Sequence, residues 1–140
     1  MSVEENKNIV RRFHELFDQG DIDGIEALLA PNCVAYMPGS PPLNREAFKQ
    51  MAMLFATSFG DSHMILEDVV AEGDIVFSRG TWHATHAGDF NGIPATGNSI
   101  QMTEMTMARI VDGKIVEHWA QPDMLGLLQQ IGVIPTPQAS

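Results

Sequence analysis

Apolar residues in the first 60 positions recur at the three- and four-residue spacing of amphipathic helices. Residues 2–19 place four apolar side chains on one helical face, those of Ile9, Phe13, Leu16 and Phe17. Ser2 and Glu5 have the spacing of a capping box at the start of this helix. A short helix is predicted over 21–31. Asn44 is placed to cap a third helix, whose apolar stripe consists of Phe48, Met51, Ala52, Phe55 and Phe59.

After residue 60 the pattern changes to that of β-strands. Four segments are rich in Val, Ile, Thr and aromatic residues and are separated by turn sequences; they span 63–73, 74–88, 99–111 and 114–121. A short strand is also predicted at 33–37, and a short C-terminal helix over 124–131. Helices followed by a meander of strands predict an α+β fold, with N-terminal helices packed on one side of a curved antiparallel sheet.

The length of the chain, 140 residues, is typical of one domain. We expect residues 1–135 to form this domain and residues 136–140 to be a loose C-terminal tail. The sequence has no internal repeat and no low-complexity linker that would indicate a second domain.

The charge of the chain limits the kinds of molecule that it is expected to bind. With 18 acidic and 8 basic residues the formal net charge is −10, which argues against electrostatic binding to nucleic acid or to anionic membranes. No apolar run approaches the length of a membrane span, so we expect a cytoplasmic protein whose partner is a small, largely apolar molecule. Cys33 is the only cysteine, which excludes an internal disulfide and a cysteine-based zinc site and favours a buried structural thiol.

The Asp112-Gly113 turn sets the expected register of the last two strands. If Val111 pairs with Lys114, the ladder continues through three further pairs: Thr106 with Trp119, Glu104 with Gln121, and Met102 with Asp123. Because side chains alternate along a strand, these six residues would share one face unless a bulge intervenes. The opposite face would then carry Met107, Arg109, His118 and Ala120.

This predicted face has two interpretations. As a pocket wall it joins a few polar groups to Trp119 and Met102, and the neighbouring carboxylates of Glu104 and Asp123 would make each other harder to ionise. As a solvated outer face it would carry Glu104 and Gln121 as an ordinary cross-strand pair. Periodicity does not say which side of the sheet is concave, so both interpretations stay open.

Asp123 also has two interpretations. It directly precedes the helical segment MLGLLQQI, where an aspartate serves as an N-cap. Capping favours the ionised carboxylate and lowers its pKa, whereas an apolar pocket raises the pKa. A capping Asp123 would therefore be able to act as a base but would be a poor proton donor at neutral pH.

The histidines do not form a metal site in this pattern. His83 and His86 lie three residues apart on a predicted strand and point to opposite faces, which is wrong for two ligands of one metal. One of them is expected to face the cavity, and His86 is the candidate. We expect His14 at the flank of the first helix's apolar stripe and interpret His118 as structural.

Nucleophilic and nucleotide-binding motifs are missing from the sequence. It contains no G-x-S-x-G, and the glycines of GDFNGIPATG join two strands rather than a strand and a helix. Nothing in the sequence implies a cofactor.

Two blocks of the chain carry a family resemblance: FNGIPATG, residues 90–97, and RIVDGKIVEHWAQPDMLGLLQQIG, residues 109–132. The chain resembles the SnoaL-like polyketide cyclases, also called the ester cyclase group, of the nuclear transport factor 2-like superfamily. The resemblance covers nearly the whole chain. It implies a cone-shaped α+β barrel with three helices, a curved sheet and a deep pocket, usually in a homodimer.

The characterised cyclases close a ring of an aromatic polyketide by intramolecular aldol condensation, without metal or cofactor and with an aspartate as acid/base. By the match before LGLLQQIG, this role would fall on Asp123, assisted by Glu104. The predicted substrate contacts are Gln121, Trp119, Thr106, Met102, Trp82 and His86. Many relatives carry an acidic residue or histidine where this chain has Thr106, which makes the acid/base pair incomplete.

The resemblance therefore implies a cofactor-independent cyclase that acts on a small, largely apolar polycarbonyl ester. Two alternatives remain on the same scaffold. One is a noncatalytic protein that binds a small molecule, and the other is an isomerase, dehydratase or hydrolase, because one fold hosts many functions.

Overall fold

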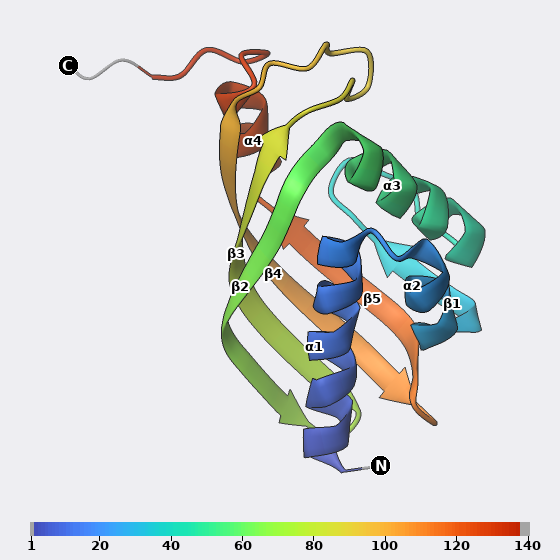
Figure 1. The fold of residues 1–140 in the computed structure, drawn as a ribbon. Coiled ribbons are helices and arrows are strands. Elements are labelled where there is room, and N and C mark those ends of the chain that lie inside the picture. Colours follow the sequence, from blue (N-terminus) through green and yellow to red (C-terminus); the bar gives the residue numbers. More distant parts are fainter. Residues whose placement is uncertain (1, 138–140) are drawn as a thin grey trace.

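The computed structural model describes residues 2–137 as four helices and one five-stranded sheet (Figure 1). The helices are α1 (Val3–Gln19), α2 (Ile22–Leu28), α3 (Arg45–Ser58) and α4 (Met124–Gln130). The strands are β1 (Leu29–Tyr36), β2 (Phe59–Glu72), β3 (Ile75–His86), β4 (Ser99–Val111) and β5 (Lys114–Pro122). This confirms the predicted α+β class. Residues 138–140 of the predicted tail lie outside the described residues, and the division into domain and tail stays a prediction.

The helices begin at the caps that the sequence predicts. The Ser2 hydroxyl accepts a hydrogen bond from the Glu5 amide, and the Glu5 carboxylate accepts one from the Ser2 amide, so the capping box is complete. The Asn44 side chain accepts a hydrogen bond of 2.8 Å from the Ala47 amide at the start of α3. These contacts satisfy amide groups that a helix N-terminus otherwise leaves unpaired.

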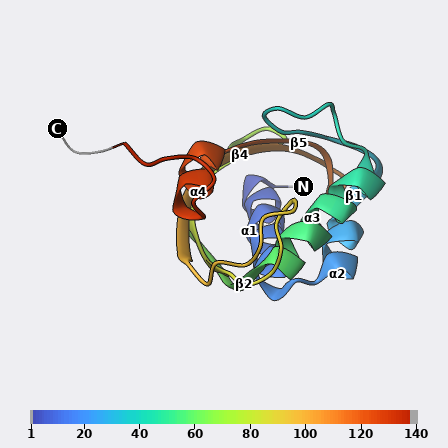
Figure 2. The same cartoon turned by 90° about the horizontal axis from the view of Figure 1, so that it is seen from above.

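The strand order is β1-β5-β4-β3-β2. Neighbouring strands are antiparallel except β1 and β5, which are parallel, so the expectation of a wholly antiparallel sheet is wrong at this edge. The parallel pair arises because the chain leaves β1 through α3 and enters the far edge of the sheet as β2, which leaves the edge beside β1 to the last strand. Seen from above, the sheet curves around α1 (Figure 2).

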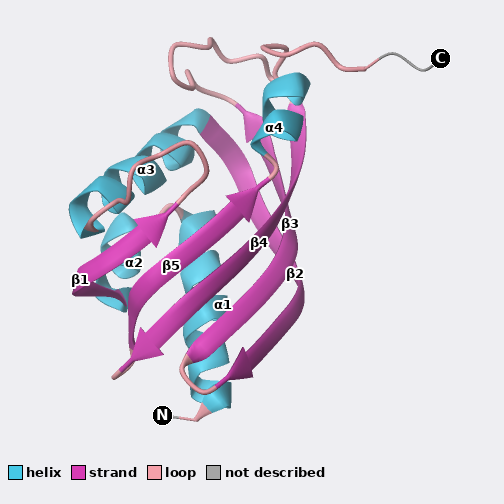
Figure 3. Ribbon diagram, turned by 180° about the vertical axis from the view of Figure 1, so that it is seen from behind, coloured by secondary structure: helices cyan, strands magenta, loops and turns pink. Residues whose placement is uncertain are grey.

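The core lies between the concave face of the sheet and the three N-terminal helices. One cluster of buried side chains joins α1, α2, α3 and β1 to the sheet and includes Phe13, Phe48 and the thiol-bearing Cys33, which is buried as predicted. A second cluster around Phe59, Trp82 and Leu127 joins α4 to β2, β3 and β4. The convex face carries no helix over its middle (Figure 3). None of the helices in residues 2–137 is long and apolar enough to cross a membrane.

A β-bulge in the last hairpin changes the faces of β5. Ile110 pairs with Ile115, as the turn predicts, but the next pair is Arg109 with Glu117, which leaves Val116 as the extra residue. From this point every residue of β5 faces the side opposite to the predicted one. The bulge keeps Glu117 out of the core and places its carboxylate 2.9 Å from the Arg109 guanidinium.

Candidate functional site

A cavity of about 270 Å³ lies between α1, α3 and the concave face of the sheet. Its wall includes six aromatic side chains: Phe13, Phe17, Phe48, Phe55, Phe59 and Trp82. Four methionines contribute flexible, polarisable side chains to the same wall: Met37, Met51, Met64 and Met102. An apolar cavity with a few convergent polar groups has the composition of a small-molecule binding site.

Glu104 is the carboxylate that the middle of the sheet brings to this cavity, and Asp18 of α1 and Asp61 of β2 also line it. It lies in the middle of β4, between Gly80 of β3 and Pro122 of β5, so no polar neighbour on the adjacent strands faces it. Within residues 2–137 its carboxylate accepts no hydrogen bond, and burial raises its pKa to about 7. A carboxyl group with this pKa can both accept and donate a proton near neutral pH.

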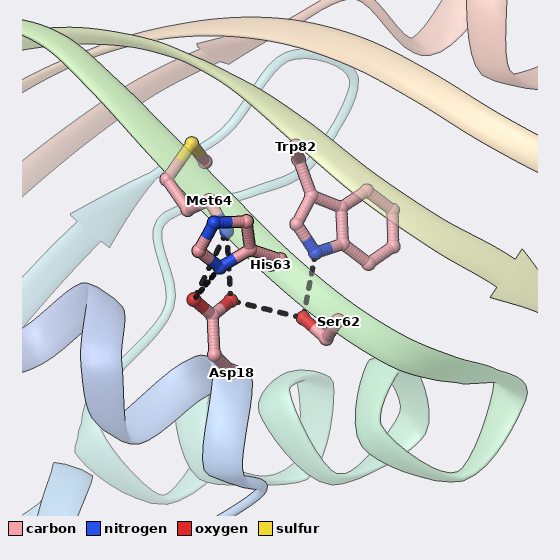
Figure 4. A network of polar contacts seen from close by, with 5 residues as sticks. All are labelled: Asp18, Ser62, His63, Met64 and Trp82. Atoms are coloured by element: carbon pink, nitrogen blue, oxygen red, sulfur yellow. Dashed lines mark hydrogen bonds and ion pairs between the residues drawn. The ribbon is translucent and has the colours of Figure 1, made fainter.

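A network of hydrogen bonds contacts Trp82, one of the aromatic residues in the cavity wall (Figure 4). Asp18, in the last turn of α1, accepts hydrogen bonds from the Ser62 hydroxyl at 3.0 Å and from the Met64 amide at 2.9 Å. Because Ser62 donates its only proton to Asp18, its oxygen is free to accept the Trp82 indole N–H at 2.7 Å. The network therefore fixes the orientation of Trp82. Sequence reasoning did not single out Asp18 or Ser62.

Two histidines that the sequence analysis had placed elsewhere, His14 and His118, line the cavity. His118 faces inward because of the bulge, and its ring lies 5.3 Å from that of Phe13 and 5.6 Å from that of Phe48. His14 is buried on α1 rather than on the flank of its stripe. Burial lowers the pKa of His14 to about 4 and that of His118 to about 3, so both rings are neutral at pH 7.

Three of the predicted site residues meet at the cavity: Glu104, Met102 and Trp82. Thr106 and His86 face the same side of the sheet but do not line the cavity. The Thr106 hydroxyl is hydrogen-bonded to that of Ser78. His86 is fully buried, as the inward member of the His83 and His86 pair, and its Nδ1 lies 2.9 Å from the Thr96 hydroxyl.

The predicted convergence of Trp119 and Gln121 with Glu104 is wrong. In the bulged register Trp119 pairs with Met107 and Gln121 with Met105 on the convex face of the sheet. The Asp112-Gly113 turn fixed only the first pairs of the ladder, and one extra residue reversed the faces beyond them. As for metals, no cluster of three or more potential ligands among His, Cys, Asp and Glu occurs within the described part of the chain.

Asp123 is exposed at the start of α4 and does not line the cavity. Its side chain accepts a hydrogen bond of 2.9 Å from the Gly126 amide, which confirms the predicted N-cap. Its role as acid/base stays a prediction.

The cap gives a stability test. Asp123→Ala should lower the free energy of unfolding by about 1 kcal/mol because the Gly126 amide loses its partner, while Asp123→Asn should lower it by only a few tenths, since Asn caps helices equally well. Urea denaturation of the two variants and the wild type measures both values. Equal losses for Asn and Ala would show that the negative charge, rather than the cap, matters at this position.

Helices packed over one face of a strongly curved sheet, with an apolar cavity between them, define a protein of the nuclear transport factor 2-like class. Within that class, the sequence profile described as "SnoaL-like polyketide cyclase" matches residues 7–131. The chain belongs to the SnoaL-like polyketide cyclase family.

Similar proteins point the same way. Aklanonic acid methyl ester cyclase DnrD of Streptomyces peucetius is 29% identical over 138 residues, which cover 94% of each chain. Nogalonic acid methyl ester cyclase of Streptomyces nogalater is 26% identical over 125 residues, covering 83% of this chain and 89% of that one. Among solved structures, IdmH of Streptomyces antibioticus, a proposed polyketide cyclase, is 32% identical with a TM-score of 0.80, covering 91% of this chain and 99% of its own.

The fold is also shared by a protein with another proposed activity. AclR of Streptomyces galilaeus, a proposed hydroxylase, superposes with a TM-score of 0.90 at 28% identity and covers 98% of this chain and 87% of its own. The fold alone therefore does not determine which reaction is catalysed, because that depends on the residues of the cavity.

Proposed function

We propose that this protein is an ester cyclase that closes a ring of a small, largely apolar polycarbonyl ester by an intramolecular aldol reaction. The observation that carries the proposal is the carboxyl group of Glu104, which has no hydrogen-bond partner among residues 2–137, lies in an apolar cavity and has a pKa of about 7. The methyl ester cyclase activity of the relatives supports the choice of reaction and substrate class.

The proposed reaction uses Glu104 twice. Its carboxylate removes a proton from a carbon flanked by two carbonyl groups, a position acidic enough for a carboxylate base. The resulting enolate carbon attacks a ketone carbonyl of the same molecule, which forms the new carbon–carbon bond. The alkoxide left on the former ketone takes the proton back from Glu104, so the product is an isomer of the substrate and the enzyme is unchanged. Cofactor independence stays a prediction that the resemblance implies.

The composition of the cavity wall favours this chemistry, and the volume of the cavity limits the size of the substrate. Its aromatic and thioether side chains place apolar groups around the enolate, and an apolar surrounding strengthens any hydrogen bond made to it. Its volume, about 270 Å³, is near the lower end of the roughly 300–1,000 Å³ usual for ligand pockets, so we expect a compact substrate of a few rings.

A turnover assay tests the proposal. Purified protein is incubated with aromatic polyketide methyl esters that carry a β-dicarbonyl group, with aklanonic and nogalonic acid methyl esters among them, and ring closure is followed by product mass and retention. We expect an isomeric product with at least one ester. Binding of the esters without any product would favour the alternative, a noncatalytic small-molecule-binding protein.

Asp123→Asn is the informative variant in the same assay. Asp123 caps α4 outside the cavity, so the proposal expects turnover to persist. Loss of turnover with binding retained would instead assign the base to Asp123, as the family resemblance implies.

We also propose that the protein is a homodimer that associates through the convex face of the sheet. A row of apolar side chains crosses all five strands there, with each residue paired to the next: Tyr36, Trp119, Met107, Phe77 and Val70. The Tyr36 and Trp119 rings stack at 5.4 Å, and Val70 is 56% exposed. Contiguous exposed apolar rows of this kind mark protein interfaces, and a second copy presents a matching row. The cytoplasmic location stays a prediction.

Association is tested by light scattering coupled to size-exclusion chromatography. Wild type should elute with the mass of two chains, and Met107→Glu should elute as a monomer because it places a charge in the middle of the row. Met53→Glu changes an exposed methionine on α3, away from this face, and should leave the dimer intact. A monomeric wild type would refute the proposed dimer.

A further inference from the structure

His118 is a buried polar side chain for which the structure offers no partner. It is only 6% exposed, and its ring packs against the neighbouring rings of Phe13 and Phe48, whose centroids are 6.0 Å apart. Neither ring nitrogen makes a hydrogen bond within residues 2–137, and Nδ1 is completely shielded. Buried polar groups almost always have a partner, so an exception at a cavity wall calls for an explanation by a ligand.

The shielding of Nδ1 determines the tautomer. A neutral imidazole carries one proton, and the nitrogen without it is an acceptor. A buried N–H without a partner is rarer than a buried acceptor without one. The proton therefore belongs on Nε2, the nitrogen that is not among the shielded atoms. His118 in this form presents an N–H donor to the cavity.

We propose that His118 binds the ligand by donating a hydrogen bond from Nε2 to a neutral carbonyl oxygen. Burial and the neighbouring His14 both disfavour the charged ring and lower the pKa of His118, which fits a neutral oxygen as the partner better than a carboxylate. Burial against the rings of Phe13 and Phe48 leaves the imidazole little freedom, so the donor is held in place before the ligand arrives.

The position of His118 says which part of the ligand it contacts. Glu104 pairs with Pro122, and His118 lies four residues from Pro122 along β5, so the backbones of Glu104 and His118 are about 13 Å apart at roughly 3.3 Å per residue. Side chains of a strand stand roughly perpendicular to the sheet rather than along it, so the two groups reach different parts of a ligand that lies along the cavity. His118 therefore contacts a carbonyl remote from the carbon that Glu104 deprotonates, as a ligand of two or three fused rings would allow. The assignment of that reacting carbon rests on the proposed function; the hydrogen bond of His118 does not.

The experiment uses two small probes with the same bicyclic frame, 1-tetralone, which has a ketone, and tetralin, which lacks it. His118→Phe keeps an aromatic ring packed against Phe13 and Phe48 and removes the donor, and His118→Gln restores an N–H donor. Calorimetry should show 1-tetralone binding about 3- to 10-fold more weakly to His118→Phe than to wild type, the usual effect of one neutral hydrogen bond. Tetralin affinity should be unchanged, and His118→Gln should recover part of the loss. Unchanged 1-tetralone affinity, or equal losses for both probes, would overturn the proposal.

Nitrogen-15 NMR of the wild type provides a test that does not depend on the folding of the variants. The His118 ring, assigned through its bonds to the His118 backbone, should be neutral at pH 7 with its proton on Nε2, and that proton should shift on addition of 1-tetralone but not of tetralin. A proton on Nδ1, or no selective shift, would contradict the proposal. Ester turnover is measured separately, so a protein that binds the ketone through His118 without cyclising any ester retains this inference and loses only the proposed function.

Discussion

Glu104→Gln should lower the turnover of a polyketide methyl ester by about 10²- to 10⁴-fold, the usual contribution of a general acid or base. Gln has nearly the same shape as Glu but cannot take a proton from carbon at neutral pH. Binding of the ester should persist, because the wall of the cavity is unchanged. In the wild type, turnover should rise with pH, reach half of its maximum near pH 7 and level off about one pH unit higher, since the ionised form of Glu104 is the base.

Met105→Gln is the matched control, because Met105 is the next residue of β4 but is exposed on the convex face. Its turnover should equal that of the wild type. The proposed role of Glu104 fails if Glu104→Gln retains turnover. Loss of turnover in Asp123→Asn under the same conditions would move the base to the helix cap.

The same carboxyl group should make the protein less stable as the pH rises. Burial raises the pKa of Glu104 from its ordinary 4.5 to about 7, so between these values the folded state binds more protons than the unfolded state. The contribution to stability is fully present below about 4.5, decreases as the pH rises toward 7, and stays low above it. A pKa change of this size corresponds to an upper limit of about 3 kcal/mol. Glu104→Gln should therefore unfold at increasingly higher urea concentrations than wild type as the pH is raised from 4.5 to 8.

Comparison of the two proteins at each pH is needed because buried histidines act in the opposite direction. The pKa of His14 is lowered to about 4 and that of His118 to about 3, so their contribution is present above about 6.5 and is lost as the pH falls. Both proteins contain these histidines, so their effect cancels in the difference. A difference that does not change with pH would mean that Glu104 titrates as it does in an unfolded chain.

Local signals predicted the elements well because they depend on neighbouring residues. The capping box of Ser2 and Glu5, the cap at Asn44 and the cap at Asp123 are all present as predicted. Alternation along β4 likewise predicted that Glu104, Thr106 and Met102 share a face, and they do. Each of these features is decided within a few residues of chain, where turn and capping chemistry is strong.

The site was less predictable because it depends on contacts between distant segments. Ile115 and His118 are both buried although they are three residues apart, a spacing that simple alternation forbids. The pairing of Arg109 with Glu117 was the available signal, since the alternative register would have turned Glu117 toward the core. Asp18 and His14 could not have been placed at the cavity at all, because only the packing of α1 across β2 brings them there.

The bulge also has a consequence for how the hairpin folds. The Asp112-Gly113 turn by itself favours a ladder without a bulge, in which Trp119 and Gln121 would face inward. Two registers that differ by one residue are thus available to the hairpin, and its own turn favours the one without the bulge, which is not the native one. The native register is stabilised within the hairpin by the Arg109–Glu117 ion pair and across the fold by the packing of His118 against Phe13 of α1 and Phe48 of α3. Because a partly exposed ion pair contributes little, most of this stabilisation comes from helices in the other half of the chain, and the packing of His118 thus also selects the strand alignment.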